Sequence, residues 1–215
     1  MSRLPRAYRD GALLTWRHLP TLAWLNLIWI ALSWTVLLAG PATLAAYALI
    51  AALREDIEPD LRRYPALLRQ NLLPGVLWLL SSATFAFVVY SNLVYWRRLL
   101  GPFGDSVVSL LAVYLTWLYV ALQPYLLEGL SVERRPFLQA WTPAFLALAR
   151  SPLSAHLYVV VPAFLLVVSF FTRTFALVVL VSVALAFAAT QVRPLVERAE
   201  PPEPSADLPE DPSPA

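Results

Sequence analysis

The sequence predicts an all-α integral membrane protein with six transmembrane helices arranged as three hairpins and with short cytoplasmic amphipathic helices. Of its 215 residues, 59% are hydrophobic. Asp, Glu and Arg are absent from five long stretches, residues 18–53, 70–96, 106–127, 151–172 and 174–192. A helix needs about 20 apolar residues to cross the hydrocarbon core of a bilayer. Each stretch is therefore long enough for one crossing, and the first is long enough for two.

The first stretch contains the dipeptide Gly40-Pro41 near its centre. Proline lacks an amide donor and clashes with the preceding helical turn, and glycine relaxes the backbone, so the pair predicts a break. We therefore expect one helix over residues 19–39 and a second over residues 41–57. The alternative is a single tilted and kinked helix. Because the second helix is short, Arg54 at its end is expected to snorkel to the membrane interface.

The remaining stretches predict four more crossings, over residues 72–95, 106–127, 153–172 and 174–192. The connection from Arg97 to Asp105 contains Gly-Pro and Gly-Asp, which are typical of turns. The last hairpin is expected to turn at Thr172-Arg173-Thr174.

The arginines decide the orientation of these crossings. All 16 basic residues are arginine. With six crossings, thirteen arginines fall on one side of the membrane, and only Arg97, Arg98 and Arg173 fall on the other. Five crossings would divide them far more evenly. Cytoplasmic loops carry the excess of basic residues, so we expect a multi-pass protein of the cytoplasmic membrane with both termini in the cytoplasm.

The chain divides into three parts. Residues 1–18 form a basic amphipathic segment, residues 19–198 the six-span membrane domain, and residues 199–215 an acidic, proline-rich tail that is expected to be disordered. Three amphipathic stretches precede crossings on the cytoplasmic side and are expected to lie at the membrane surface. Their sequences are YRDGALLTWRHLP, YPALLRQNLLP and FLQAWTPAFLALARSP, and Pro65 and Pro136 are expected in first turns of helices.

The sequence argues against catalysis. It has no cysteine and only two histidines, both near predicted ends of crossings. No ionisable residue lies in the middle of a crossing, whereas ion pumps and proton-coupled carriers need charge at that depth. We find no spacing typical of a metal site, a phosphate loop or a nucleophile. We expect no enzymatic activity and no cofactor, and a lipid bilayer rather than a nucleic acid as the partner.

Several uncharged polar residues are candidates for a ligand path. Asn26, Asn92 and Gln123 lie within crossings, where they either line a path for a solute or bond across helices. Pro124 frees a carbonyl beside Gln123 and Tyr125. The remaining candidates are Thr43 and Tyr47, which follow the helix-break motif Gly40-Pro41. Glu128 is expected at the cytoplasmic interface, paired with Arg134 or Arg135.

One segment resembles a known family. The run Leu38-Ala39-Gly40-Pro41-Ala42-Thr43-Leu44-Ala45-Ala46-Tyr47 is followed by a charged stretch and then by Tyr64 and Leu68-Arg69-Gln70-Asn71-Leu72. This pattern, over about residues 15–75, resembles the YesL family of bacterial membrane proteins, domain of unknown function 624. The resemblance implies an association with carbohydrate uptake, and with a membrane permease or a sensor protein as partner.

Three functional hypotheses follow. The first is a non-enzymatic accessory of a sugar-uptake or membrane-sensing system. The second is a carrier for a neutral or amphiphilic solute, which predicts a water-accessible cavity lined by Asn92, Gln123 or Tyr47. The third is a lipid-binding membrane scaffold, which predicts that the basic N-terminal segment binds anionic lipid.

Overall fold

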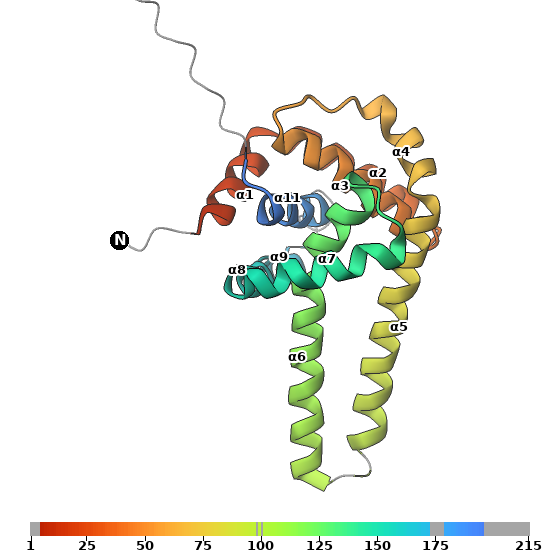
Figure 1. The fold of residues 1–215 in the computed structure, drawn as a ribbon, viewed down its shortest axis with the longest axis vertical. Helices are drawn as coiled ribbons and strands as arrows, with labels where there is room; N and C mark the ends of the chain where they lie inside the picture. The colour runs from red at the N-terminus through yellow and green to blue at the C-terminus, as the bar shows by residue number, and fades with distance from the viewer. Residues whose placement is uncertain (1–4, 98, 100, 173–178, 196–215) are drawn as a thin grey trace, which may run out of the picture.

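The computed structural model describes residues 5–97, 99, 101–172 and 179–195, and within these ranges the chain is helical with no strand (Figure 1). The elements are α1 (Arg6–Arg17), α2 (Leu19–Ser33), α3 (Ala39–Arg54), the 3₁₀ turn η1 (Leu61–Arg63), α4 (Tyr64–Gln70), α5 (Leu72–Arg97), α6 (Gly101–Leu127), the π turn η2 (Glu128–Val132), α7 (Phe137–Arg150), α8 (Pro152–Tyr158), α9 (Val160–Phe171) and α11 (Leu180–Val192). The all-α prediction is confirmed. Helices α5 and α6 run side by side and extend well beyond the cluster of the other helices.

Three helical stretches are long and apolar enough to cross a membrane, Leu72–Trp96, Gly101–Val132 and Pro152–Phe171. The apolar helices α2, α3 and α11 are shorter. The longest of them, α3, has 16 residues and is therefore about 24 Å long, which is less than the roughly 30 Å of a hydrocarbon core. The membrane class is supported by these three stretches, whereas six crossings in three hairpins remain a prediction.

The predicted break in the first apolar stretch is present, but it comes earlier than Gly40-Pro41. Helix α2 ends at Ser33 and α3 begins at Ala39, and Val36 in the connection has a φ of 54°. The two helices contact each other, and the Trp29 indole donates a hydrogen bond to Thr43 Oγ1 at 2.8 Å. A single kinked helix is therefore excluded. Pro41 lies in the first turn of α3, where its missing amide hydrogen costs nothing.

Gly40 brings two helix backbones into contact. A Cβ on Gly40 would lie 2.1 Å from the carbonyl oxygen of Gly75 in α5, and a Cβ on Gly75 would lie 2.4 Å from the nitrogen of Pro41. Small residues at such crossings let membrane helices approach closely. The glycine therefore serves the packing of α3 on α5, rather than the turn for which it was predicted.

Helices form at the three amphipathic stretches, as α1, α4 and α7. Pro65 lies in the first turn of α4 as predicted, whereas Pro136 is the residue before the first turn of α7. Helix α4 is fixed to α3, because the buried Tyr64 hydroxyl donates to the carbonyl oxygen of Ala42 at 3.0 Å. Burial raises the pKa of Tyr64, which keeps this hydroxyl protonated as a donor.

The buried face of α1 packs on α11 at the other end of the chain. Gly11 and Leu14 are buried there, and the Thr190 hydroxyl donates to the carbonyl oxygen of Ala7 at 3.2 Å. The buried Asp10 accepts a hydrogen bond from the amide of Leu195 at 3.2 Å. This face is therefore covered by protein, although the amphipathic stretch was expected to lie at the membrane surface with one face among the lipid headgroups.

Two other boundaries differ from the prediction. Helix α6 begins at Gly101, because Pro102 is compatible with the first turn of a helix, so the expected loop from Arg97 to Asp105 is shorter. The predicted crossing over residues 153–172 contains two helices, α8 and α9. Most of the predicted turn at residues 172–174 lies outside the described residues. The predicted acidic tail, residues 199–215, lies wholly outside them.

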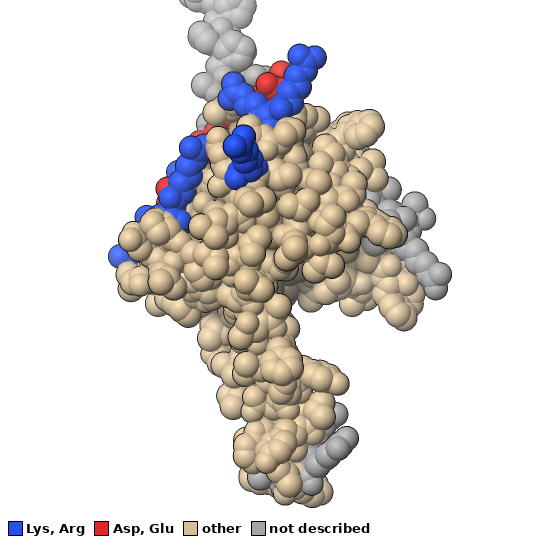
Figure 2. Space-filling view, turned by 90° about the vertical axis from the view of Figure 1, so that its right-hand side faces the viewer, with Lys and Arg blue, Asp and Glu red and all other residues tan. Residues whose placement is uncertain are grey.

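Charged side chains gather at one end of the face shown in Figure 2, opposite the tip of the α5–α6 pair. The C-terminal ends of α3 and α6 carry Arg54 and Glu128, and α11 is followed by Arg193. We call this end of the molecule the arginine-rich end. It is the end that the charge distribution of the sequence assigns to the cytoplasm.

A buried amide fixes the start of α11. Asn26 on α2 is 1% exposed, and its Oδ1 accepts hydrogen bonds from the amides of Val181 at 3.0 Å and Ser182 at 3.3 Å. These amides lie in the first turn of α11, where they lack partners within the helix. Asn26 therefore caps a helix that is distant in sequence.

Replacing Asn26 with leucine is expected to destabilise the folded protein by about 1 kcal/mol, the usual cost of losing a helix cap. The matched control is Asn92→Leu, because Asn92 is exposed and its hydrogen bonds to described residues, Val88 and Trp96, lie within α5. Unfolding by SDS in mixed micelles measures both changes. Equal stability of the two variants would show that the cap contributes nothing.

Candidate functional site

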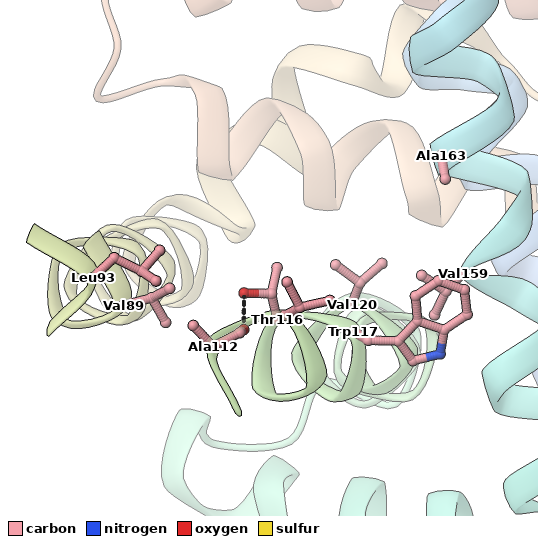
Figure 3. Close-up of a pocket in the computed structure, with 9 residues that line it drawn as sticks. Val89, Leu93, Ala112, Thr116, Trp117, Val120, Val159 and Ala163 are labelled. Carbon is pink, nitrogen blue, oxygen red and sulfur yellow. Dashed lines mark hydrogen bonds between the residues drawn. The ribbon is translucent and has the colours of Figure 1, made fainter. Parts of the chain in front are cut away.

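Two apolar grooves flank α6. The first, which we call the α7 groove, has a volume of about 540 Å³ and lies between α5, α6 and α7. The second has a volume of about 270 Å³ and lies between α5, α6 and the α8–α9 segment. Figure 3 shows Thr116, Trp117 and Val120 of α6 in the second groove, with Val89 and Leu93 of α5 on one side and Val159 and Ala163 on the other. The Thr116 hydroxyl is used internally, since it donates to the carbonyl oxygen of Ala112 at 2.8 Å.

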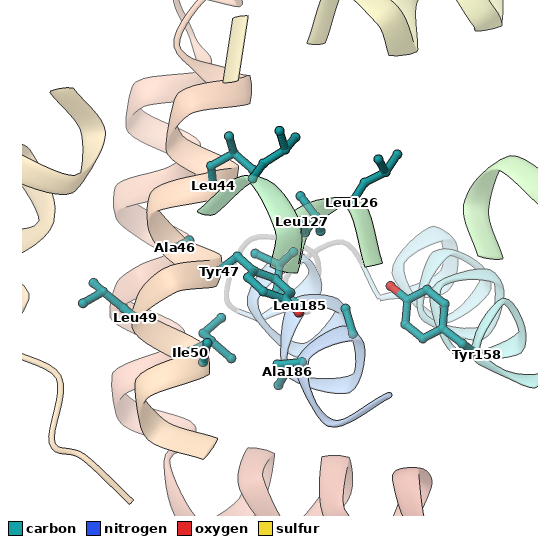
Figure 4. Close-up of a cluster of buried hydrophobic side chains, with 14 of the residues drawn as sticks. Leu44, Ala46, Tyr47, Leu49, Ile50, Leu126, Leu127, Tyr158, Leu185 and Ala186 are labelled. Carbon is teal, nitrogen blue, oxygen red and sulfur yellow. The ribbon is translucent and has the colours of Figure 1, made fainter. Parts of the chain in front are cut away.

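The apolar core surrounds α3. Nearly every side chain of this helix from Gly40 to Leu53 is buried. In Figure 4, Leu44, Tyr47 and Ile50 of α3 lie beside Leu126 and Leu127 of α6 and Leu185 and Ala186 of α11. Helix α3 is therefore the element against which α6 and α11 are positioned.

A carboxylate lies inside this core, at the point where α6 becomes a π turn. Glu128 begins the π turn η2, four residues after Pro124, and is 2% exposed. Proline removes a helical hydrogen bond, and π turns are frequent at functional sites. Because η2 packs on α3, the side chain of Glu128 meets groups of α3 rather than water.

Glu128 is held by two residues of α3. The Arg54 guanidinium donates from Nη1 to Oε2 and from Nη2 to Oε1, both at 3.2 Å, and the Tyr47 hydroxyl donates to Oε2 at 2.9 Å. Arg54 is 1% exposed, and its Nη1 also donates to the carbonyl oxygen of Ala189 in α11 at 2.9 Å. We call Tyr47, Arg54 and Glu128 the buried polar cluster. It joins α3, α6 and α11.

Further charges connect this cluster to the surface. Arg193 Nε lies 3.3 Å from Glu128 Oε1, and Arg193 Nη2 lies 3.3 Å from Glu133 Oε1. Arg135 Nε pairs with Glu133 Oε2 at 2.6 Å. A cavity of about 170 Å³ lies beside these groups, with Tyr125, Glu128 and Pro143 among its lining residues.

The expectations for Arg54 and Glu128 were wrong. Arg54 does not snorkel to the interface, and Glu128 pairs with Arg54 and Arg193 rather than with Arg134 or Arg135. The short helix α3 ends inside the protein, so its terminal arginine lies in the core beside the end of α6. A signal was present in the sequence, because opposite charges follow the apolar stretches 18–53 and 106–127 at ends predicted to lie on the same side.

The other candidate residues are used in packing. Thr43 Oγ1 donates to the carbonyl oxygen of Ala39 at 2.7 Å in addition to its bond from Trp29. Gln123 accepts from the Trp78 indole at 2.8 Å and donates to the carbonyl oxygen of Tyr119 at 3.1 Å. The Tyr125 hydroxyl lies 3.3 Å from Ser151 Oγ. Of the candidates, the structure brings only Tyr47 into the buried polar cluster, and Tyr125 into the wall of the adjacent cavity.

Replacing Trp78 with phenylalanine removes the bond to Gln123 and is expected to cost about 0.6 kcal/mol, the average for a hydrogen bond between membrane helices. The same change at Trp96, whose indole bonds to Asn92 within α5, should cost less because no second helix is involved. SDS unfolding curves of the two variants provide the comparison. A larger loss of stability for Trp96→Phe than for Trp78→Phe would contradict the interpretation that the bond from Trp78 to Gln123 holds α5 and α6 together.

Within the described residues, no group of three or more His, Cys, Asp or Glu could hold a metal ion. By length and composition, three helices of the described residues could cross a membrane, which is typical of a helical membrane protein. The family model described as "Protein of unknown function, DUF624" matches residues 22–93. This match confirms the resemblance to the YesL family over α2, α3, α4 and most of α5, a segment that includes Gly40, Tyr47 and Arg54 but not Glu128. No curated protein and no solved structure matches the chain.

Proposed function

We propose that the protein is a non-enzymatic integral membrane protein of the cytoplasmic membrane, and that it is an accessory to another membrane protein such as a permease or a sensor. The supporting observation is the extension of α5 and α6 beyond the other helices (Figure 1). This pair carries large, exposed apolar side chains, including Phe87, Tyr90, Phe103, Leu110 and Val113. Exposed apolar surface of this extent is typical of a region that contacts lipid or another protein.

The orientation follows from the charges. We propose that α5 and α6 cross the bilayer, with the arginine-rich end in the cytoplasm and the α5–α6 connection on the opposite side. Excess basic residues favour the cytoplasmic side, and Figure 2 is consistent with one charged end. The six crossings predicted from the sequence require α2, α3 and α11 to cross as well, through a locally thinned bilayer.

The buried polar cluster supports a non-catalytic protein. Its arginine, carboxylate and tyrosine are bonded to one another and to backbone carbonyl groups. Such bonds hold helices together, and a fully bonded network of this kind leaves its groups occupied rather than available to a substrate.

The carrier hypothesis has less support. Tyr47, Asn92 and Gln123, the residues expected to line a solute path, all bond within the protein. The scaffold hypothesis relied on the N-terminal segment, whose buried face packs on α11. We therefore propose the accessory role in preference to the other two.

Photocrosslinking in native membranes tests this proposal. A photoreactive amino acid is placed at Leu110 on the exposed α5–α6 pair, and at Leu138 on α7 as a control that is similarly exposed. We expect Leu110 to form a discrete protein adduct that mass spectrometry identifies as a permease or sensor component, and Leu138 to form none. Lipid adducts alone at both positions would overturn the accessory role.

A further inference from the structure

We infer that the α7 groove binds one acyl chain of an anionic phospholipid from the cytoplasmic leaflet, with the phosphate held by arginines at the arginine-rich end. This inference depends on the proposed membrane orientation of α5 and α6 but not on the accessory role. It concerns a specific bound lipid, distinct from the bulk bilayer around the protein.

The groove has the form of a ligand site. Helix α5 contributes Thr84 and Phe85, α6 contributes Leu118 and Tyr119, and α7 contributes Trp141 and Phe145. Phe85 and Tyr119 stack with ring centroids 4.1 Å apart, and the Tyr119 hydroxyl lies 2.8 Å from Ser82 Oγ, so the α5–α6 wall is fixed in place. The volume of about 540 Å³ falls within the range of about 300–1,000 Å³ that is usual for ligand pockets.

The depth of the groove favours an acyl chain as its occupant. Ser81 lies nine residues after the start of α5, and Leu118 lies nine residues before the end of α6. At 1.5 Å per residue, both are about 14 Å from the arginine-rich end. The deepest lining residue, Phe85, lies 13 residues after the start of α5, or about 20 Å from that end. With that end at the interface, the groove therefore extends through the hydrocarbon layer of the nearer leaflet, which is about 15 Å thick, to the middle of the bilayer. Water is excluded at this depth, and lipid chains surround the groove.

Charge favours an anionic headgroup. Arg69 precedes the start of α5 by three residues, and Arg134 lies between η2 and α7, so both are at the end of the helices that line the groove. Both are exposed, and neither side chain forms an ion pair with another described residue. A guanidinium group can donate two parallel hydrogen bonds to the oxygens of one phosphate. Basic residues beside a membrane also attract anionic lipid.

Native mass spectrometry of bound lipid tests the inference. The full-length protein is reconstituted into nanodiscs with equal amounts of anionic and zwitterionic phospholipid, transferred to detergent and measured. Leu118→Trp fills the groove, and Leu110→Trp places the same side chain on an exposed part of α6 as a control. A double variant, Arg69→Gln with Arg134→Gln, tests the headgroup contact. Its control is Arg63→Gln, which removes an exposed ion pair with Asp60.

We expect the wild type and Leu110→Trp to retain an anionic phospholipid and Leu118→Trp to lose it. Each arginine removed should weaken the preference for anionic lipid by about fivefold, whereas Arg63→Gln should leave it unchanged. Circular dichroism and elution volume establish that each variant is folded. If Leu118→Trp does not fold, Phe145→Trp narrows the same groove from α7.

Three outcomes would overturn the inference. They are a wild type without retained phospholipid, equal retention by folded Leu118→Trp and Leu110→Trp, and an unchanged headgroup preference in the double arginine variant. None of them bears on the accessory role, because the crosslinking experiment at Leu110 uses a different surface and a different readout.

Discussion

Replacing Glu128 with glutamine is expected to destabilise the folded protein by about 3 kcal/mol, since it leaves a buried guanidinium without its main counter-charge. Arg54 is 1% exposed, and glutamine would still offer it one acceptor oxygen but no charge, so that Glu55 is the carboxylate left to Arg54 among the described residues. Glu55 is partly exposed, so its compensation is weak. SDS unfolding in mixed micelles measures the loss.

A double variant separates charge from packing. Arg54→Met together with Glu128→Leu removes both charges and is expected to recover most of the lost stability, as buried ion pairs often exchange for apolar residues at little cost. The control is Arg63→Gln, which breaks an exposed pair with Asp60, leaves the Asp60 cap of η1 in place and should cost less than about 1 kcal/mol. A Glu128→Gln variant as stable as the control would contradict the role of the cluster in joining α3, α6 and α11.

The second large effect is expected at the crossing of α3 and α5. Replacing Gly75 with alanine places a Cβ 2.4 Å from the nitrogen of Pro41 and 2.8 Å from the carbonyl carbon of Gly40. These are backbone atoms, so the two helices must separate. We expect a loss of about 3 kcal/mol, at the upper end of the range for overpacked sites.

Gly129→Ala is the matched control, because its Cβ would meet Ala140 Cβ at an ordinary 3.5 Å. This variant should be nearly neutral, since alanine is favoured over glycine in helices. SDS unfolding curves and far-ultraviolet circular dichroism compare the two proteins. A Gly75→Ala variant with the stability of Gly129→Ala would show that the close approach is unimportant.

Much of the fold could be predicted because apolar stretches and proline positions are local signals. The break between α2 and α3, the three amphipathic helices and the place of Pro65 in the first turn of α4 all follow from such signals. The partner of Gly40 could not be predicted in this way, since the contact with Gly75 depends on how α3 crosses α5. A glycine in a turn and a glycine at a helix crossing look the same in a single sequence.

The candidate site was predicted only in part. Tyr47 was identified, but Arg54 and Glu128 were assigned to the interface because charges at the ends of apolar stretches usually reach water. Three features place Arg54 and Glu128 in the core. They are the shortness of α3, the π turn after Pro124, and the packing of α11 on both α3 and α6. Each is a property of the folded chain. The capping of α11 by Asn26 is likewise a contact between residues far apart in sequence.

The orientation of the α5–α6 pair is the claim on which the proposals depend, and cysteine labelling in intact cells tests it most directly. The chain has no native cysteine, so single cysteines at Phe103, near the tip of the pair, and at Ala66, on α4, can be compared without background. A membrane-impermeant maleimide is expected to label Phe103→Cys in intact cells, and Ala66→Cys only after permeabilisation. Labelling of both positions under the same condition would contradict a membrane crossing between them.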